Sequence, residues 1–489
     1  MTDHELPVFD AALQLTCRFQ QTFDPHDLDI AIDAWGVLTS RAGRTDEIAP
    51  LMLCDALSNR AVLLVQRHFI GGHTTDLDDA LDAWERALTV VQPGVVNDLI
   101  VLSNYGAGLR ARYERSGCGA DLRRMLEMFE QVVDRTPPDD PERPGRLSNL
   151  GVGLETRYDN EGNPTDLRRA YQLYADAVTG TASTHPERPG FLGNLARAAT
   201  ALYELSGDPD DLDSAVHGYR EAVAGTPPHH PERGDYLAGL GAALRLHYER
   251  TGLLTTLQAC IRTFEDALAV LSPDAPRRAD CLDGYGSALR NRYYHTGRLD
   301  DLDQAVAVYQ MALAEPRDAP SRAMHLQNLG LAAQDRFART RWPADLATAV
   351  RAHEESVLSS PVGAPQRAGR LGNLANSLLQ LFENTADAED LERAVALVDE
   401  ATMQQAGRRL LLLLGTRGSA HLHRFRLRAD PADLDVAVES FEAAVARVPA
   451  NSPHGVVFGN NLAVALSIRA ALDTDPQDKH RTSEAFQRV

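Results

Sequence analysis

The sequence predicts an all-α fold, a right-handed α-solenoid of about ten helix pairs followed by a partial repeat. Three observations predict it. The dipeptide Asp-Leu recurs roughly every 45 residues along the chain. Apolar residues within each interval follow the three-and-four spacing of amphipathic helices, and no interval alternates as a strand does. Ala and Leu dominate a composition with only 6% aromatic residues, which favours helices packed on helices.

The Asp-Leu ladder defines the repeat. Thr256-Leu257 occupies the one step from which the aspartate is missing. A fixed period of this length indicates stacked helical units instead of separate globular domains. We therefore expect residues 1–489 to form one array, with a capping repeat over 1–45, regular repeats over 51–477 and a truncated or capping helix over 478–489. The ladder consists of Asp27, Asp76, Asp121, Asp166, Asp211, Asp301, Asp345, Asp390 and Asp433.

The unit over residues 145–189 shows how each element is specified. A Gly/Asn/Pro segment over 160–164 separates its two helices, A and B. We expect Asp166 at the N-cap of helix B, where a carboxylate accepts hydrogen bonds from free backbone amides. A turn ending in Pro186-Glu187-Arg188 leads into the next helix A. The expected buried stripes are Leu147, Leu150, Leu154 and Tyr158 in helix A, and Leu167, Ala170, Tyr174 and Ala177 in helix B.

The core of this unit resembles the tetratricopeptide repeat (TPR). Asn149-Leu150-Gly151 followed by Leu154 matches the helix A pattern of that family, and Ala170, Tyr174 and Ala177 match its helix B pattern. The unit is longer than the usual 34 residues by about 11. It is similar in this to the long-repeat arrays that precede CHAT caspase-like protease domains in actinobacterial and fungal proteins. No CHAT domain, with its His and Cys, is present in the chain.

The resemblance implies a superhelix in which the A helices line a concave groove that binds proteins or peptides. If the chain is part of a longer polypeptide, the resemblance further implies recognition on behalf of a C-terminal CHAT-type protease.

Charge and the N-terminus exclude several classes of protein. Sixty-nine acidic residues against 49 basic ones give a net charge of −20, opposite to that of a nucleic-acid binder and unsuited to an anionic membrane surface. The N-terminus has no basic segment followed by an apolar block, and no apolar run approaches 18 residues. We expect a cytoplasmic protein whose five cysteines are free thiols that pack in the core.

No catalytic motif stands out, so an enzyme is the less favoured class, and no cofactor or metal is expected. His421 and His423 point apart on a helix, which makes a shared metal improbable. His229 and His230 fall in a turn and are expected to be solvated.

A row of asparagines provides the best candidate for a binding site. Each occupies the same position of helix A, and Asn59 fits the row with a slip of one residue; the row is broken at Gly239, Gly284 and Thr416. An amide side chain offers a donor and an acceptor, so a row of them can pair with the backbone of an extended peptide, as in the similar asparagine ladder of O-GlcNAc transferase. The alternative is that each asparagine bonds the neighbouring helix and ties the units together. The row consists of Asn104, Asn149, Asn194, Asn328, Asn373 and Asn461.

Two sets of arginines recur as well. Six residues after the asparagine position stand Arg110, Arg245 and Arg290, with Glu155, Thr200 and Gln334 in other units. These arginines are candidates to bind carboxylates of a partner, and solvated helix ends are the alternative. A second set follows a proline by two residues and is expected to pair with carboxylates or helix ends between units. This set is Arg143, Arg188, Arg233, Arg278, Arg322 and Arg367.

The sequence therefore predicts a peptide- or protein-binding scaffold whose partner is extended or basic, with no nucleic acid and no membrane involved. Two alternatives stay open. One is an enzyme or small-molecule binder with its site inside the solenoid, where His247, Tyr248 and Tyr293 would lie. The other is self-assembly into a homo-oligomer through the terminal repeats.

Overall fold

The computed structural model describes residues 6–41, 49–90, 98–315, 319–404, 410–448 and 452–472. These residues form helices joined by short turns, and none of them belongs to a strand. Contacts divide the chain into two compact bodies, Met1–Gly239 and Leu240–Val489. The expected terminal helix over 478–489 lies outside the described residues.

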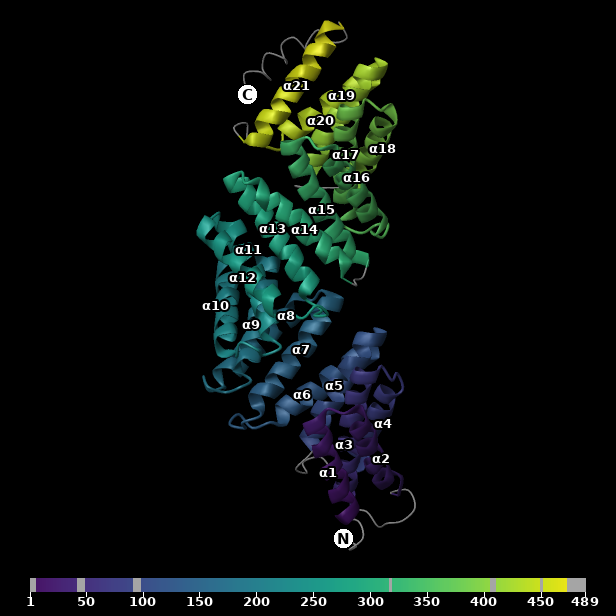
Figure 1. Cartoon of the computed structure of the whole chain (residues 1–489), viewed down its shortest axis with the longest axis vertical. Coiled ribbons are helices and arrows are strands. Elements are labelled where there is room, and N and C mark those ends of the chain that lie inside the picture. The colour runs from purple at the N-terminus through teal and green to yellow at the C-terminus, as the bar shows by residue number, and fades with distance from the viewer. Residues whose placement is uncertain are drawn as a thin grey trace. The chain divides into compact units, whose positions relative to one another are not determined.

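The helices come in pairs of one A helix and one B helix. Within each compact body, consecutive helices pack against each other (Figure 1). The A helices are α1 (Leu6–Thr22), α3 (Pro50–Gly71), α5 (Asp98–Ser116), α7 (Arg143–Glu161), α9 (Arg188–Ser206), α11 (Arg233–Thr251), α13 (Arg278–Thr296), α15 (Ala319–Thr340), α17 (Arg367–Thr385), α19 (Leu410–Arg428) and α21 (Pro453–Ala471). The B helices are α2 (Pro25–Arg41), α4 (Asp76–Val90), α6 (Gly119–Arg135), α8 (Pro164–Thr179), α10 (Pro209–Gly225), α12 (Leu254–Val270), α14 (Leu299–Ala314), α16 (Pro343–Leu358), α18 (Ala388–Gln404) and α20 (Pro431–Val445).

The expected stripes form the core of α7 and α8. Leu147, Leu150 and Leu154 are buried, and Tyr158 is half-buried. The whole stripe of α8 is inaccessible to solvent. The three-and-four periodicity of the sequence is thereby confirmed as the face on which the two helices pack.

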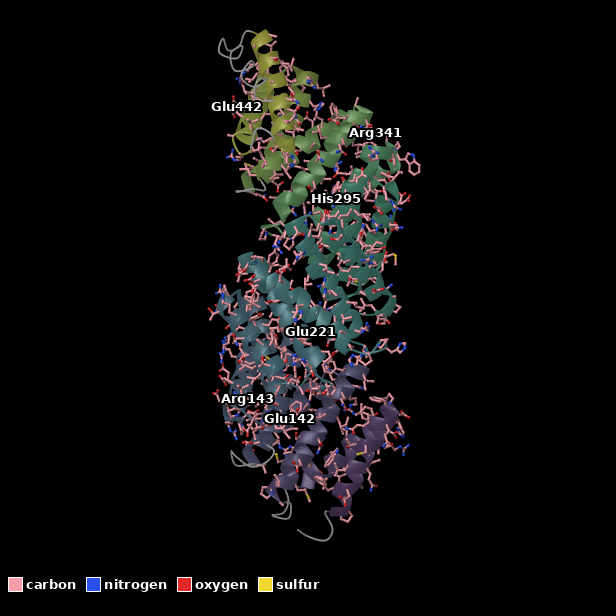
Figure 2. The ribbon with its side chains drawn as sticks, turned by 90° about the vertical axis from the view of Figure 1, so that its left-hand side faces the viewer. Glu142, Arg143, Glu221, His295, Arg341 and Glu442 are labelled. Carbon is pink, nitrogen blue, oxygen red and sulfur yellow. The ribbon has the colours of Figure 1, made fainter. Side chains whose placement is uncertain are left out.

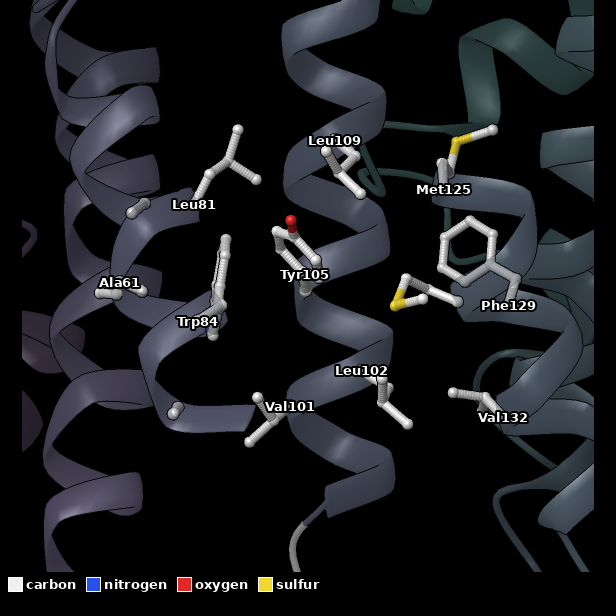
Figure 3. Packing of buried hydrophobic residues seen from close by; sticks show 14 of the residues in the cluster. Ala61, Leu81, Trp84, Val101, Leu102, Tyr105, Leu109, Met125, Phe129 and Val132 are labelled. Carbon is white, nitrogen blue, oxygen red and sulfur yellow. The ribbon is translucent and has the colours of Figure 1, made fainter. Parts of the chain in front are cut away.

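A large side chain of helix B packs against a small residue of helix A, and this contact sets how closely the pair approaches. A Cβ added to Gly106 would lie 2.6 Å from the Phe129 ring, and one added to Gly151 would lie 2.6 Å from the Tyr174 ring. In Figure 3, Tyr105 of α5 lies between Trp84 of α4 and Phe129 of α6. Small residues are therefore required at these crossings because the rings fill the space of a side chain.

The turn from helix A to helix B requires a left-handed residue. Six such turns have a glycine with φ between 67° and 72°, for example Gly162 and Gly207. Phe23, Arg341, Ala386 and Ala429 occupy the same place with φ of 52°, 59°, 59° and 55°. A side chain in this conformation costs free energy that glycine does not, so these four turns are strained.

We expect Ala429→Gly to raise the free energy of unfolding by about 0.5–1 kcal/mol, because relief of the left-handed strain exceeds the extra entropy that glycine gives the unfolded chain. Gly207→Ala should act in the opposite direction, since a Cβ there meets no atom within 4 Å and only strain is added. Ala107→Gly, at an exposed position inside α5, is the control and should destabilise. Midpoints of urea unfolding test all three, and a loss of stability in Ala429→Gly would contradict the explanation.

The prediction that Asp166 caps helix B is wrong. The N-cap of α8 is Asn163, whose Oδ1 accepts a hydrogen bond of 3.1 Å from the Thr165 amide, and Pro164 occupies the first helical position. Asp166 is the third residue of the helix, within its first turn. It is buried there because it binds a side chain of helix A, as described below.

Candidate binding face

The A helices carry the asparagine row on one face, together with the residues three, seven and ten positions further along each helix, which helical periodicity places within about 80° of the asparagine direction. We call this the A-helix face. The residues six positions further along, which include Arg110, Arg245 and Arg290, point about 120° away from it. Most of its side chains are partly exposed in the structure. What it can bind depends on which of its polar groups are already used within the protein.

In seven of the described repeats an arginine of helix A binds an aspartate of helix B, a contact that was not predicted from the sequence. Arg157 donates from Nε and Nη2 to the two carboxylate oxygens of Asp166, both at 2.7 Å. The same arginine also reaches an acidic residue of the preceding B helix in several units, as Arg67 does with Asp29 at 2.9 Å. The pairs are Arg18–Asp27, Arg67–Asp76, Arg112–Asp121, Arg157–Asp166, Arg292–Asp301, Arg336–Asp345 and Arg424–Asp433.

The signal for these pairs is present in the sequence. Each arginine precedes its aspartate by nine residues, whereas Leu202 and Leu381 stand nine residues before Asp211 and Asp390. Without the arginine, these two aspartates are only partly buried, while those of the seven pairs are buried. Burial and the nearby Asp387 also raise the pKa of Asp390.

Leu381→Arg is expected to supply the missing ion pair between α17 and α18 and to lower the pKa of Asp390. The variant should unfold at a higher temperature, and its free energy of unfolding should rise by about 1 kcal/mol. The double variant Leu381→Arg/Asp390→Asn is the control, because it keeps the arginine and removes the charge of its partner. Thermal unfolding at neutral pH measures both. An equal gain in the double variant would show that the arginine acts without the carboxylate.

The arginines that follow a proline bind helix ends, as predicted. Arg188 donates from Nη1 to the carbonyl oxygens of Val178 at 2.5 Å and Thr181 at 2.8 Å, at the end of the preceding B helix. Arg143, which is labelled in Figure 2, makes the equivalent bonds to Val133 and Thr136. The same pair of bonds recurs with Arg233, Arg278 and Arg367, and Arg322 donates to one carbonyl oxygen, that of Leu313, at 3.3 Å. These arginines are thereby used by the architecture.

The asparagines divide into two groups. Asn194 donates to Ser148 Oγ of the preceding A helix at 3.2 Å, and Asn328 donates to both carboxylate oxygens of Asp283 at 2.9 and 3.1 Å. These two tie units together. Asn149 is exposed, and Asn104, Asn373 and Asn461 are partly exposed; none of these four makes a side-chain hydrogen bond among the described residues.

The three candidate arginines all face carboxylates of their own chain. Arg110 lies 3.5 Å from Glu114, and Arg245 pairs with Glu249 one turn further along α11. Arg290 donates to Asp335 Oδ2 at 2.8 Å, across to the next A helix. The Arg110 pair is the loosest, with both side chains about half exposed.

Two largely buried networks join successive A helices. Arg197 donates to both oxygens of Glu155 at 2.8 and 2.7 Å, and the Tyr174 hydroxyl donates to the same carboxylate at 2.9 Å. Burial and the adjacent Glu155 raise the pKa of Tyr174. In the second network, Asp283 accepts from His325 at 3.0 Å and from Asn328.

Glu155 and Gln334 are only 8% and 7% exposed, so the alternative of solvated helix ends is wrong at these two positions. The charge of Glu155 is neutralised by an arginine that the chain itself provides.

The histidines bind separate partners. His421 is hydrogen-bonded to Asp433 at 2.8 Å and Asp399 at 3.2 Å, and His423 lies 3.3 Å from Glu383. Hydrogen bonds from His421 and Arg417 hold the pKa of Asp399 at about 2 although burial acts against them. His229 and His230 are exposed, as expected of a turn.

The cysteines are free in the structure. The expectation that they all pack in the core holds for Cys54, Cys260 and Cys281 and is wrong for Cys17 and Cys118, which are exposed. Within the described residues, no group of three or more His, Cys, Asp or Glu is placed to hold a metal ion. No described helix has the length and apolarity needed to cross a membrane.

Neither a protein-family model nor a curated protein matches the chain. Similar solved structures include TPR-like repeats of a kinesin light chain from Podosopora anserina, at 21% identity over 42% of this chain and 93% of that chain, with a TM-score of 0.31. The human IFIT1 dimer with PPP-AAAA is 15% identical over 86% of this chain and 94% of that chain (TM-score 0.37). A monomeric IFIT1 mutant with Gppp-AAAA is 14% identical over 99% of both chains (TM-score 0.40).

The class of the protein rests on its own repeat. Helix A, a left-handed turn, helix B and the small residue at their crossing recur in register along the chain. The chain is an array of TPR-like helix pairs.

Proposed function

We propose that the protein is a scaffold that binds a protein or peptide partner on the A-helix face. The observation that carries this proposal is the pair of unused amides at Asn104 and Asn149, in successive units of the array. An amide that lies at the surface and bonds no neighbour does not hold the array together. Each can instead donate to a carbonyl and accept from an amide of a bound chain.

The surroundings of these asparagines suit the approach of a backbone. Ser103 and Ser148 precede them in sequence, and Ala107 lies one turn further along α5. These are small side chains, so a bound segment can come close to the helices. Affinity in such an array is spread over several units, each of which adds a modest amount.

Affinity capture from a native cell extract tests the proposal. The parent chain is compared with Asn104→Ala/Asn149→Ala, which removes the unused amides, and with Asn194→Ala, which removes an amide bonded to Ser148. We expect the amount of captured protein to be lower by about tenfold or more with the double variant than with the parent, since each lost hydrogen bond contributes about 0.5–1.5 kcal/mol. The single variant should retain the partner and lose some stability. Capture that is equal for the parent and the double variant would contradict the proposal.

A further inference from the structure

Two A helices carry a second arginine, three residues after the arginine that binds the end of the preceding B helix. They are Arg146 of α7 and Arg370 of α17, each the fourth residue of its helix. Because this position is at least partly buried in both helices, each of the two guanidinium groups needs a partner close by. The same position holds Phe191, Tyr236, Cys281 and His325 in α9, α11, α13 and α15.

Arg146 finds its partners at the turn that precedes α7. Its Nη1 donates to Thr136 Oγ1 at 2.8 Å and to Asp140 Oδ2 at 3.1 Å. The other carboxylate oxygen of Asp140 accepts a hydrogen bond of 2.8 Å from the backbone amide of Glu142. One carboxylate thus neutralises the guanidinium and satisfies a free amide at the beginning of the helix.

Arg370 lacks this carboxylate. Its Nη1 donates to Ser360 Oγ, and Ser360 stands where the other turn has Thr136. Ala364, however, stands where the other turn has Asp140. The side chain that provides the negative charge before α7 is therefore absent before α17, although the guanidinium lies against the equivalent hydroxyl.

The backbone of the two turns is the same. The amide of Ala364 donates to the Pro361 carbonyl oxygen at 3.2 Å, and the amide of Asp140 donates to that of Pro137 at 3.2 Å. The amide two residues after Ala364, that of Gln366, has no acceptor among the described residues, and no side chain caps α17. The amide that Asp140 satisfies in one turn is therefore free in the other.

The charge of Arg370 is costly to the free protein. The residue is only 8% exposed, and its Nε is buried without a hydrogen-bond partner. It forms no ion pair with any described residue. Burial lowers the pKa of its guanidinium, and no described carboxylate opposes this effect. A buried charge without a counterion is strongly unfavourable, so an anion that reached this guanidinium would be bound.

We propose that the beginning of α17 is a binding site for a carboxylate of another molecule, which lies between the Gln366 amide and the Arg370 guanidinium and replaces the missing aspartate. A carboxylate has the two acceptor oxygens that this pair of donors requires, as Asp140 shows in the other turn. A Cβ added to Gly369 would meet no atom within 4 Å, so the helix surface next to Arg370 is open. The site is separate from Asn104 and Asn149, and its ligand is a small carboxylic acid or an acidic side chain of a partner.

Thermal unfolding of the full chain in sodium acetate, at neutral pH and constant ionic strength, tests the site. We expect the midpoint of the parent to rise by about 2 °C once acetate is in several-fold excess over its dissociation constant. Arg370→Gln removes the guanidinium and should lose this rise, whatever its own midpoint. The absence of a rise in the parent, or an equal rise in Arg370→Gln, would overturn the proposal.

Two exchanges between the turns provide matched controls. Ala364→Asp supplies the carboxylate from the chain itself, so it should unfold at a higher temperature than the parent and gain nothing from acetate. Asp140→Ala removes the carboxylate from Arg146, so it should unfold at a lower temperature and respond to acetate more strongly than the parent. A full acetate response in Ala364→Asp would place the bound anion elsewhere and overturn the proposal.

A capped tripeptide, Ac-Ala-Glu-Ala-amide, distinguishes the two sources of the carboxylate. Stabilisation of the parent by both acetate and the tripeptide would assign the site to an acidic side chain of a partner. Stabilisation by acetate alone would assign it to a small carboxylic acid that fits a place too recessed for a chain. The tripeptide with Gln in place of Glu is the control and should have no effect, because it lacks the charge that Arg370 requires. Equal stabilisation by the Gln and Glu tripeptides would contradict the carboxylate assignment.

Discussion

Gly151→Ala is expected to lower the free energy of unfolding by about 2 kcal/mol, although alanine is the better helix former. The added Cβ would lie 2.6 Å from the ring of Tyr174, which is fully buried. The ring cannot shift freely because its hydroxyl donates to Glu155, which Arg197 also holds. The added methyl group therefore forces α7 away from α8 or breaks a buried hydrogen bond.

Gly145→Ala in the same helix is the matched control. A Cβ at Gly145 meets no atom within 4 Å, so this variant should gain up to about 1 kcal/mol from helix propensity alone. Chemical unfolding of the two variants measures the difference, and the double variant Gly151→Ala/Tyr174→Leu should recover part of the loss. A gain of stability in Gly151→Ala would show that the crossing of α7 and α8 accommodates the added methyl group.

Acidification from pH 7 to pH 5 is expected to cost the protein about 2 kcal/mol of stability through His353 alone. His353 is 1% exposed, and its Nδ1 is hydrogen-bonded to Ser377 Oγ at 2.8 Å. Burial lowers the pKa of His353 to about 4. In the unfolded chain its pKa is near 6.5, so the unfolded state binds the proton first. Stability is complete above pH 6.5 and falls as the pH drops from there towards 4.

His353→Phe tests this assignment. His353 occupies the position that Phe129, Phe264 and Phe441 fill in other units, and it packs on Gly330 as those rings pack on their small partners. Phenylalanine should therefore fit, with a small loss at pH 7 from the unpaired Ser377 hydroxyl. Unfolding curves at pH 7 and pH 5 should show a smaller difference for the variant than for the parent. An unchanged difference would assign the acid sensitivity to other groups.

The helices and their packing could be predicted because the period and the apolar spacing are local properties of the chain. Leu147, Leu150 and Leu154 are buried for the reason their spacing indicates. Even the small residue where helix A crosses helix B is visible in the sequence, as Gly106, Gly151 and Ala375 at one position of the repeat. The N-cap prediction is wrong because Asp166 and Asn163 are both good capping residues, and only the backbone shows which of them is the N-cap.

The binding face could be predicted only as a set of positions. A shared position in the repeat predicts a shared face, but it does not say which side chains are already occupied. Asn149 and Asn194 are equivalent in the sequence, yet one is exposed and the other donates to Ser148. Arg290 is a candidate for binding a partner until Asp335 of the next A helix is placed beside it.

The sequence by itself determined that this chain is an array of helix pairs, because a period of about 45 residues and amphipathic spacing act over short distances. The tertiary structure alone decided which polar groups join the units and which are left for a partner. Those outcomes depend on side chains that lie about 45 residues apart in the chain and within 3 Å in space, such as Arg290 and Asp335 at 2.8 Å. A hydrogen bond or ion pair is satisfied by distance and direction, and these are fixed only when the units pack.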